Sequence, residues 1–271
     1  MTSLWSEDPD SAQADESHFD GAWTRLLALA VGGKALAVPG DDSFGGAFWH
    51  RYAPIALGHA CPAFVIGQLG QSLDGRVATA TGRSHYVNGP ESLSHLHRLR
   101  ALVDAVVVGI GTVLADDPQL TVRRVEGPNP ARVVIDPNGR LPPTARLLAG
   151  DGAPVYAVQG QARNRPEGVE PIILPCRDGK LDPADMVAAL AERGFRRLLI
   201  EGGAGTVSAF LSAGAIHRLH ICVAPILIGS GPIGISLPPI DALEAAMRPR
   251  TAIHRLGRDI LFDCDLAAAR R

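Results

Sequence analysis

The sequence RLLIEGGAGT, residues 197–206, carries an apolar run directly into a glycine-rich turn. Residues 198–200 predict a buried strand, and a helix is predicted from about Thr206 to Ala213. Glycine-rich backbone at a helix N-terminus offers unpaired N–H groups and the positive end of the helix dipole, which suit a pyrophosphate. A tight turn without any ligand is the alternative interpretation. Glu201 favours a ligand, because a carboxylate at the end of an apolar strand is costly unless it faces a ligand or solvent.

Around this stretch, short apolar runs bounded by Gly, Pro or Asp alternate with segments of helical period. Helices are predicted at about 90–103 and after Asp182-Pro183, in addition to the one after the glycine-rich turn. The predicted strands are Ala63–Leu69, Asp104–Ile110, Arg132–Asp136, Pro154–Val158, Pro171–Leu174, Arg197–Glu201, Leu219–Ile226, Ala252–Leu256 and Ile260–Asp265. This order predicts an α/β fold whose sheet is mostly parallel, with helices on both faces and ligands beyond the carboxyl ends of the strands.

A second glycine-containing strand end is followed by two adjacent carboxylates, in Gly109-Ile110-Gly111-Thr112-Val113-Leu114-Ala115-Asp116-Asp117-Pro118. Gly109 and Gly111 let a ligand approach the backbone closely. Adjacent Asp residues before Pro are also typical of a helix cap and a turn. We expect residues 109–116 and 201–206 to lie together and to form one ligand cradle.

Two further motifs have equally good structural interpretations. Ser72-Leu73-Asp74-Gly75-Arg76 follows the first predicted strand and has the composition of a turn. Ala224-Pro225-Ile226-Leu227-Ile228-Gly229-Ser230-Gly231 runs from a strand into a glycine pair, which is typical of a strand end as much as of a ligand contact.

Composition limits the classes of function. The chain has 271 residues, 46% of them hydrophobic, and a formal net charge of −2, so no field attracts nucleic acid or an anionic membrane surface. No segment is both long and apolar enough to span a bilayer, and the acidic start is unlike a signal peptide. The four cysteines stand far apart, which favours free thiols in the cytoplasm. We expect a cytoplasmic protein with a small-molecule substrate.

The histidines predict no metal site. His95 and His97 lie two apart on a predicted helix, and His217 and His220 lie three apart at a strand start, so each pair should diverge. We expect them to be surface or capping residues. Residues 1–20, rich in Ser, Asp and Glu, predict a disordered tail, and residues 21–62 predict a packed N-terminal extension of unknown role.

Together, the motifs resemble those of the riboflavin-pathway pyrimidine reductases, the reductase half of RibD-type bifunctional enzymes. The shared motifs, in order, are Ser72 to Arg76, Gly82-Arg83-Ser84, Leu99-Arg100-Ala101, Gly111 to Pro118 with Leu120-Thr121-Val122-Arg123, Glu201-Gly202-Gly203, Ala224-Pro225 and Gly229. The resemblance covers roughly residues 63–265 and assigns 63–271 to one reductase domain. It implies a dihydrofolate-reductase-like fold, a homodimer, and NADPH-dependent reduction of the ribosyl group of a 5-amino-6-(5-phosphoribosylamino)uracil-type substrate.

The resemblance also implies roles for individual residues. Cofactor contacts would come from Gly70, Tyr86, Gly109, Thr112, Asp116, Gly202, Gly203, Ala204, Gly205, Thr206 and Val207. Substrate contacts would come from Ser84, Arg100, Leu120, Arg123 and Glu201. The two arginines have forked donors that suit a phosphate dianion. Asp116 or Glu201 would relay the proton or stabilise developing positive charge. Arg140, after the strand ending at Asp136, is a candidate for contacting the 2′-phosphate of NADPH.

Two departures from the family pattern leave other functions open. The bacterial reductases usually carry Lys where this chain has Gln68, and the H-x-E and P-C-x-x-C motifs of the zinc deaminase half do not occur in these residues. A reductase of another heterocycle, such as a pterin, is one alternative. A non-catalytic NADPH-binding protein is the other.

Overall fold

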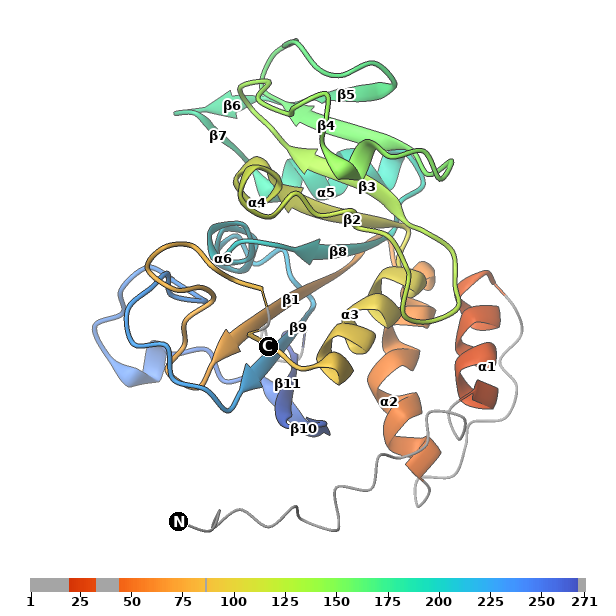
Figure 1. The fold of residues 1–271 in the computed structure, drawn as a ribbon, viewed down its shortest axis with the longest axis vertical. Helices are drawn as coiled ribbons and strands as arrows, with labels where there is room; N and C mark the ends of the chain where they lie inside the picture. The colour runs from red at the N-terminus through yellow and green to blue at the C-terminus, as the bar shows by residue number, and fades with distance from the viewer. Residues whose placement is uncertain (1–19, 33–43, 86, 268–271) are drawn as a thin grey trace, which may run out of the picture.

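The computed structural model describes residues 20–32, 44–85 and 87–267, and in these ranges one nine-stranded sheet runs through the molecule (Figure 1). Its strand order is β10-β11-β9-β1-β8-β2-β3-β4-β5. The bounds are β1 (Phe64–Ser72), β2 (Ala105–Gly109), β3 (Ala131–Ile135), β4 (Val155–Gln159), β5 (Val169–Ile173), β8 (Arg197–Glu201), β9 (Arg218–Ala224), β10 (Arg250–Leu256) and β11 (Asp259–Asp265). The short strands β6 (Cys176–Arg177) and β7 (Lys180–Leu181) form a separate hairpin.

Parallel pairing dominates this sheet. From β9 through β1, β8, β2, β3 and β4 to β5, every neighbouring pair is parallel, and only the pairings of β11 with β9 and β10 are antiparallel. The carboxyl ends of β1, β8, β2 and β3 therefore meet at one edge. The predicted α/β class with a mostly parallel sheet is confirmed.

Helices cover both faces of the sheet. Alternate residues of β2 face opposite ways, so Val106 and Val108 join one core and Ala105 and Val107 join the other. The first core packs under α3 (Pro90–Leu102) and α4 (Ile110–Asp116), and the second under α5 (Pro183–Glu192) and α6 (Ala204–Ser212). Single 3₁₀ turns occur at Leu57–Ala60, Arg146–Leu148 and Leu243–Ala245.

Two N-terminal helices belong to the first core. They are α1 (Asp20–Ala30) and α2 (Phe44–Ala56), which lie side by side against α3 (Figure 1). The rings of Trp23, Phe48 and Tyr52 meet one another, with Trp23 and Tyr52 centroids 6.1 Å apart. Within the predicted extension at 21–62, the described helices α1 and α2 pack into the first core. Residues 33–43 of the extension, and the predicted tail except for Asp20, lie outside the described residues.

The segment after β2 differs from the sequence-based interpretation. We expected a strand end followed by a cap and turn, whereas residues 110–116 form the short helix α4. Its last turn ends at Asp117, which adopts a left-handed conformation (φ 41°) and donates its N–H to Val113 O. Asp117 is therefore a helix C-cap, so the expected strand end and cap hold, and the helix between them was not expected.

His95, His97 and His220 are buried, so the prediction that they are surface or capping residues is wrong. His95 lies between its neighbours in a continuous line: Tyr52 Oη to His95 Nδ1 is 2.7 Å, and His95 Nε2 to His220 Nδ1 is 3.1 Å. His220 Nε2 lies 3.0 Å from Oδ1 of Asp263. A neutral His95 protonated on Nε2 accepts from Tyr52 Oη and donates to His220 Nδ1.

Electrostatics keep these rings neutral. Burial lowers the pKa of His95, and the neighbouring His220, Arg51 and Arg98 lower it further. Burial also lowers the pKa of His220 despite the hydrogen bond to Asp263, and lowers the pKa of His97 to about 3 with help from Arg100, Arg123 and Arg124. The buried carboxyl of Asp263 has a pKa far below its usual range, because hydrogen bonds from His220, His254 and Arg218 outweigh its desolvation.

Stability should fall as the pH drops below about 6.5, the pKa of an unfolded histidine. Above that value the three rings are neutral in both the folded and the unfolded chain. Below it the unfolded chain binds protons on these rings more readily than the folded chain, so the free energy of unfolding falls. Between pH 7.5 and 5.5 His95 and His97 should each lower the free energy of unfolding by about 1.4 kcal/mol, and His220 should add to this loss. Urea unfolding at a series of pH values measures this, and a flat profile across that interval would contradict the buried neutral state.

Candidate active site

Two strand ends meet at the carboxyl edge of the sheet. β8 and β2 are parallel neighbours, β8 leads into α6 and β2 leads into α4 (Figure 1). Gly203 N donates to Thr112 Oγ1 at 2.8 Å, which joins the two turns directly. A Cβ on Gly109 would lie 2.6 Å from Thr206 Oγ1, so only glycine permits this approach. The two segments expected to form one cradle therefore do lie together, with the space beside Gly109 used by Thr206.

The start of α6 is suited to an anion. Gly202 has φ 131°, a conformation open to glycine, and the N-cap Gly203 contributes no side-chain cap. The first N–H groups of a helix have no intrahelical acceptor. A Cβ on Gly205 or on Gly111 would meet no atom within 4 Å, so the backbone there faces open space. These features fit the pyrophosphate of a dinucleotide, the group that the family resemblance implies.

Other predicted cofactor contacts lie differently. The side chain of Val207 is fully buried in the second core, which leaves only its backbone for a ligand. The open side of Gly70 is filled by the Asn88 side chain, whose amide donates to Asp259 and to Cys222 O. Ala204 opens α6 beside Gly203. Tyr86 lies outside the described residues.

Ser84 and Asp116 form a polar pair in which the Ser84 hydroxyl donates to Asp116 Oδ1 at 2.9 Å. Asp116 ends the last turn of α4, while Ser84 comes from the segment between β1 and α3. The structure thus brings together one residue expected to contact substrate and one expected to contact cofactor.

A second pair lies at the end of β8. Arg100 of α3, only 5% exposed, donates from Nε to Glu201 Oε2 at 2.8 Å and from Nη2 to Oε1. Its Nη1 donates to Thr121 O at 2.9 Å. Arg100 was expected to bind a phosphate, but its Nε and Nη2 donors are occupied by the Glu201 carboxylate. Arg100 therefore holds Glu201 in place. Gln68 of β1 stands in register beside Glu201, so a neutral amide flanks this carboxylate.

Of the two arginines expected to contact substrate, Arg123 is the exposed one. Its backbone N–H donates to His97 Nδ1 at 2.8 Å, which uses the neutral form of that buried ring, and its guanidinium contacts Thr121 Oγ1. Partial burial and the nearby Arg100 and Arg146 lower the pKa of Arg123 from its usual value. A concentration of positive charge of this kind favours a dianion. Leu120 is fully buried and has φ 58°, so its side chain points into the protein.

The turn at Ser72–Arg76 is structural. Asp74 accepts from Ser72 Oγ at 2.5 Å and from the backbone N–H groups of Ile228 and Gly229 at 3.1 and 2.7 Å. These hydrogen bonds lower the pKa of Asp74 to about 2. The motif thus ties the end of β1 to residues 226–231, and the structural interpretation of both segments fits their contacts.

The family model of the RibD C-terminal domain matches residues 63–262, which is most of the chain. This chain belongs to the RibD C-terminal domain family. Its strand-end cradle and both polar pairs lie within the matched residues. The family match begins at residue 63, so α1 and α2 lie outside it although they share its core.

Relatives of known name include archaeal and bacterial proteins. The 2,5-diamino-6-ribosylamino-4(3H)-pyrimidinone 5′-phosphate reductase of Methanothermobacter thermautotrophicus is 38% identical over 174 residues, 61% of this chain and 79% of that protein. The riboflavin biosynthesis protein RibD of Escherichia coli is 32% identical over 209 residues, 71% of this chain and 57% of that protein. The chain therefore spans little more than half of the bacterial RibD proteins.

Solved RibD structures share the fold. The structure of Acinetobacter baumannii RibD is 27% identical, with a TM-score of 0.65, and the match covers 82% of this chain and 62% of that one. The fold class that the resemblance implied is confirmed. Among the described residues of this RibD-family chain, no helix is long and apolar enough to cross a membrane, and no cluster of three His, Cys, Asp or Glu side chains could hold a metal.

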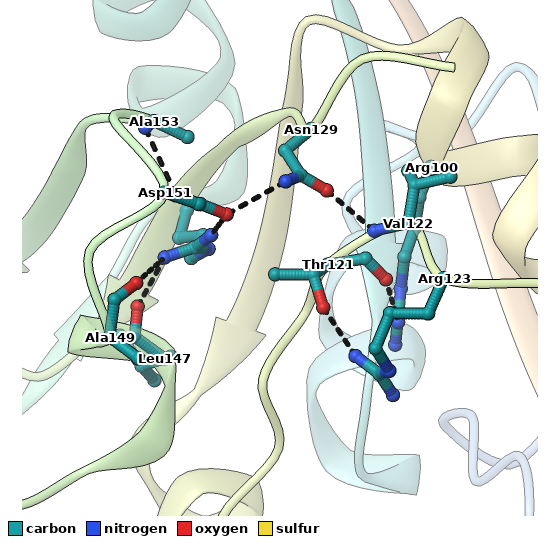
Figure 2. Close-up of polar contacts among 10 residues, drawn as sticks. Arg100, Thr121, Val122, Arg123, Asn129, Leu147, Ala149, Asp151 and Ala153 are labelled. Carbon is teal, nitrogen blue, oxygen red and sulfur yellow. Dashed lines mark hydrogen bonds and ion pairs between the residues drawn. The ribbon is translucent and has the colours of Figure 1, made fainter. Parts of the chain in front are cut away.

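The RibD-family site rests on a network that the sequence did not reveal. Arg132 of β3, 1% exposed, donates to Leu147 O at 2.6 Å and pairs with Asp151. Asn129 then links Asp151 to the segment carrying Thr121 and Arg123, since its amide donates to Asp151 at 2.8 Å and its carbonyl accepts from Val122 N at 2.6 Å (Figure 2). Residues so far apart in sequence and without a motif give no local signal.

Asp151→Ala should destabilise the fold by about 3 kcal/mol, because it leaves the buried guanidinium of Arg132 without its countercharge. Urea unfolding measures the loss. Asp241→Ala removes an exposed carboxylate and should change the free energy of unfolding by less than about 0.5 kcal/mol. Equal stability of the two variants would contradict the role given to the Arg132–Asp151 pair.

Proposed function

We propose that this chain is an NADPH-dependent oxidoreductase that reduces the ribosyl group of a 5-amino-6-(5-phosphoribosylamino)uracil-type substrate to a ribityl chain in riboflavin biosynthesis. One observation carries the proposal. The glycine-rich start of α6, the Ser84–Asp116 pair and the Arg100–Glu201 pair all come from the carboxyl edge of the sheet or from segments bonded to it. Family membership and the names of the archaeal relatives support it.

The dinucleotide would be held chiefly by backbone. The N–H groups at the start of α6 would bind its pyrophosphate, with Gly111 and Gly205 leaving room for close approach. When bound, NADPH supplies the hydride. Thr112, which already bonds Gly203, would keep the two turns at a fixed spacing around it. The protein's part is to orient the reacting atoms rather than to provide the electrons.

The substrate would lie beside the two polar pairs. Arg123 would bind the ribose 5-phosphate, since its guanidinium is exposed and charge-assisted contacts to phosphate are strong. Arg100 would act indirectly, by fixing Glu201 and the Thr121 carbonyl. Opening the sugar ring requires a proton at the ring oxygen, and reduction then occurs at C1′ of the resulting imine.

The acid residues would divide this work. Asp116 accepts a hydrogen bond from the Ser84 hydroxyl and can pass a proton through that hydroxyl to or from the sugar. Glu201 is held by both donors of Arg100 and would stabilise the positive charge of the imine without moving.

Arg123→Ala should raise the KM for the phosphorylated substrate by about 10- to 100-fold, because one charge-assisted contact contributes about 1.5–3 kcal/mol. The kcat should change little, since the phosphate is remote from C1′. Steady-state NADPH oxidation measures both, with Arg124→Ala as the neighbouring exposed control. The dephosphorylated substrate should be used equally by the wild type and the Arg123 variant; an equal loss on both substrates would refute the phosphate role.

The same assay separates the alternatives. Turnover of a pterin, tolerated by Arg123→Ala, would favour a reductase of another heterocycle. NADPH binding without oxidation by the 5-amino or the 2,5-diamino pyrimidine would favour the non-catalytic protein. Comparing these two pyrimidines also shows whether the chain resembles the archaeal relatives in its substrate.

We further propose a cytoplasmic homodimer. The cysteines, two of them exposed, are unpaired, which suits a reducing compartment. Several large apolar side chains are exposed in one stretch and favour a protein contact: Ile226, Leu227, Ile233, Leu237, Ile240, Leu243 and Met247. Light scattering during size-exclusion chromatography measures the oligomeric state.

A further inference from the structure

A cleft of about 550 Å³ lies beyond the start of α6, on the side of β3. Its floor is apolar, with the buried side chains of Met186 and Phe210, and its walls include Ile135, Pro137 and Thr206. Such a volume, with an apolar floor and a few polar groups at the rim, is typical of a site for part of a small ligand.

The cleft continues the proposed dinucleotide site. Gly205 and Thr206 belong both to its lining and to the first turn of α6, where the pyrophosphate would bind. In the sheet, β3 lies two strands from β8, about 10 Å away, on the side opposite β1. A dinucleotide whose reacting end lies near Glu201 would therefore place its adenosine end in this cleft.

The rim of the cleft is a short hairpin. Asp178 and Gly179, both with positive φ (50° and 73°), connect β6 to β7, as expected of a type I′ turn. In this hairpin Arg177 pairs directly with Lys180 across the strands, and both residues line the cleft. The hairpin thus presents two cations at one place. Figure 1 shows β6 and β7 above α4 in this view.

This arrangement is unfavourable without an anion. Like charges directly opposite one another across two strands destabilise the pairing. Within the described ranges, no carboxylate lies within 4.0 Å of either cation in an ion pair. The two carboxylates in the cleft lining lie at the start of α5. Asp182 is its N-cap and accepts from Ala184 N at 2.8 Å, and Asp185 lies in the first turn, at the positive end of the helix dipole.

We propose that Arg177 and Lys180 bind the 2′-phosphate on the adenosine half of NADPH and thereby select NADPH over NADH. The inference rests on the proposed function, because it places a dinucleotide along α6. A ribose hydroxyl needs no cation, whereas a phosphate dianion between a forked guanidinium and an ammonium relieves their repulsion. Arg140, the candidate from sequence, is exposed but is not part of the cleft lining.

The test is direct titration of the full chain with NADP⁺ and with NAD⁺ by calorimetry, without pyrimidine substrate. For the variant Arg177→Ser/Lys180→Ser, the Kd for NADP⁺ should rise at least tenfold, the size of one lost charge-assisted contact. The Kd for NAD⁺ should stay within threefold. Because the substitutions remove a repulsion, the melting temperature should not fall. The matched control is Arg196→Ser, an exposed residue just before the amino end of β8, and it should change neither Kd.

Each other outcome overturns the proposal or the function on which it rests. An equal loss for both nucleotides would mean that the hairpin shapes the cleft without contacting the phosphate. Loss of selectivity in Arg140→Ser, with the hairpin variant unchanged, would assign the phosphate to the end of β3. If the wild type turns over the pyrimidine and the hairpin variant keeps its NADP⁺ affinity, only the hairpin role fails. Selective NADP⁺ binding through the hairpin without pyrimidine turnover would leave the hairpin role and overturn the reductase function.

Discussion

The ion pair between Arg100 and Glu201 is the constraint on which the site depends. It joins α3, which covers one face of the sheet, to the end of β8, from which α6 begins on the other face. The third donor of Arg100 holds the Thr121 carbonyl and so fixes the segment that ends at Arg123. Both partners are largely buried, and removing either would leave an uncompensated charge. Helix, strand end and loop are therefore positioned by one guanidinium.

Much of this architecture could be predicted from local pattern. Strands such as β2 and β8 are short apolar runs with clear boundaries, and their glycine-rich ends were expected to converge because parallel strands share an edge. The helix α4 was missed because seven residues beginning in Ile-Gly-Thr carry little periodicity. The dipeptide Asp178-Gly179 is a local signal for a two-residue hairpin, and it forms the turn between β6 and β7.

The partners of the site residues could not be predicted. Arg100 has the forked donors of a phosphate ligand, and nothing local shows that Glu201, 101 residues later, occupies them. The burial of His95 likewise depends on Tyr52 and His220, which come from distant elements. The helix α2 contains two glycines and Pro54, so its own propensity is poor. It gains stability from aromatic side chains that pack on α1 and α3.

The helices α1 and α2 share one core with the matched family domain, so the chain cannot be cut between them without exposing that core. A version starting at residue 63, where the family match starts, would bare the apolar surface around Leu99 and Leu102 that now packs with Trp23, Leu26 and Ile55. Surface of that kind is what chaperones and proteases recognise in a cell. We therefore expect the smallest independently folding unit to include α1 and α2, whose apolar side chains cover this part of the core.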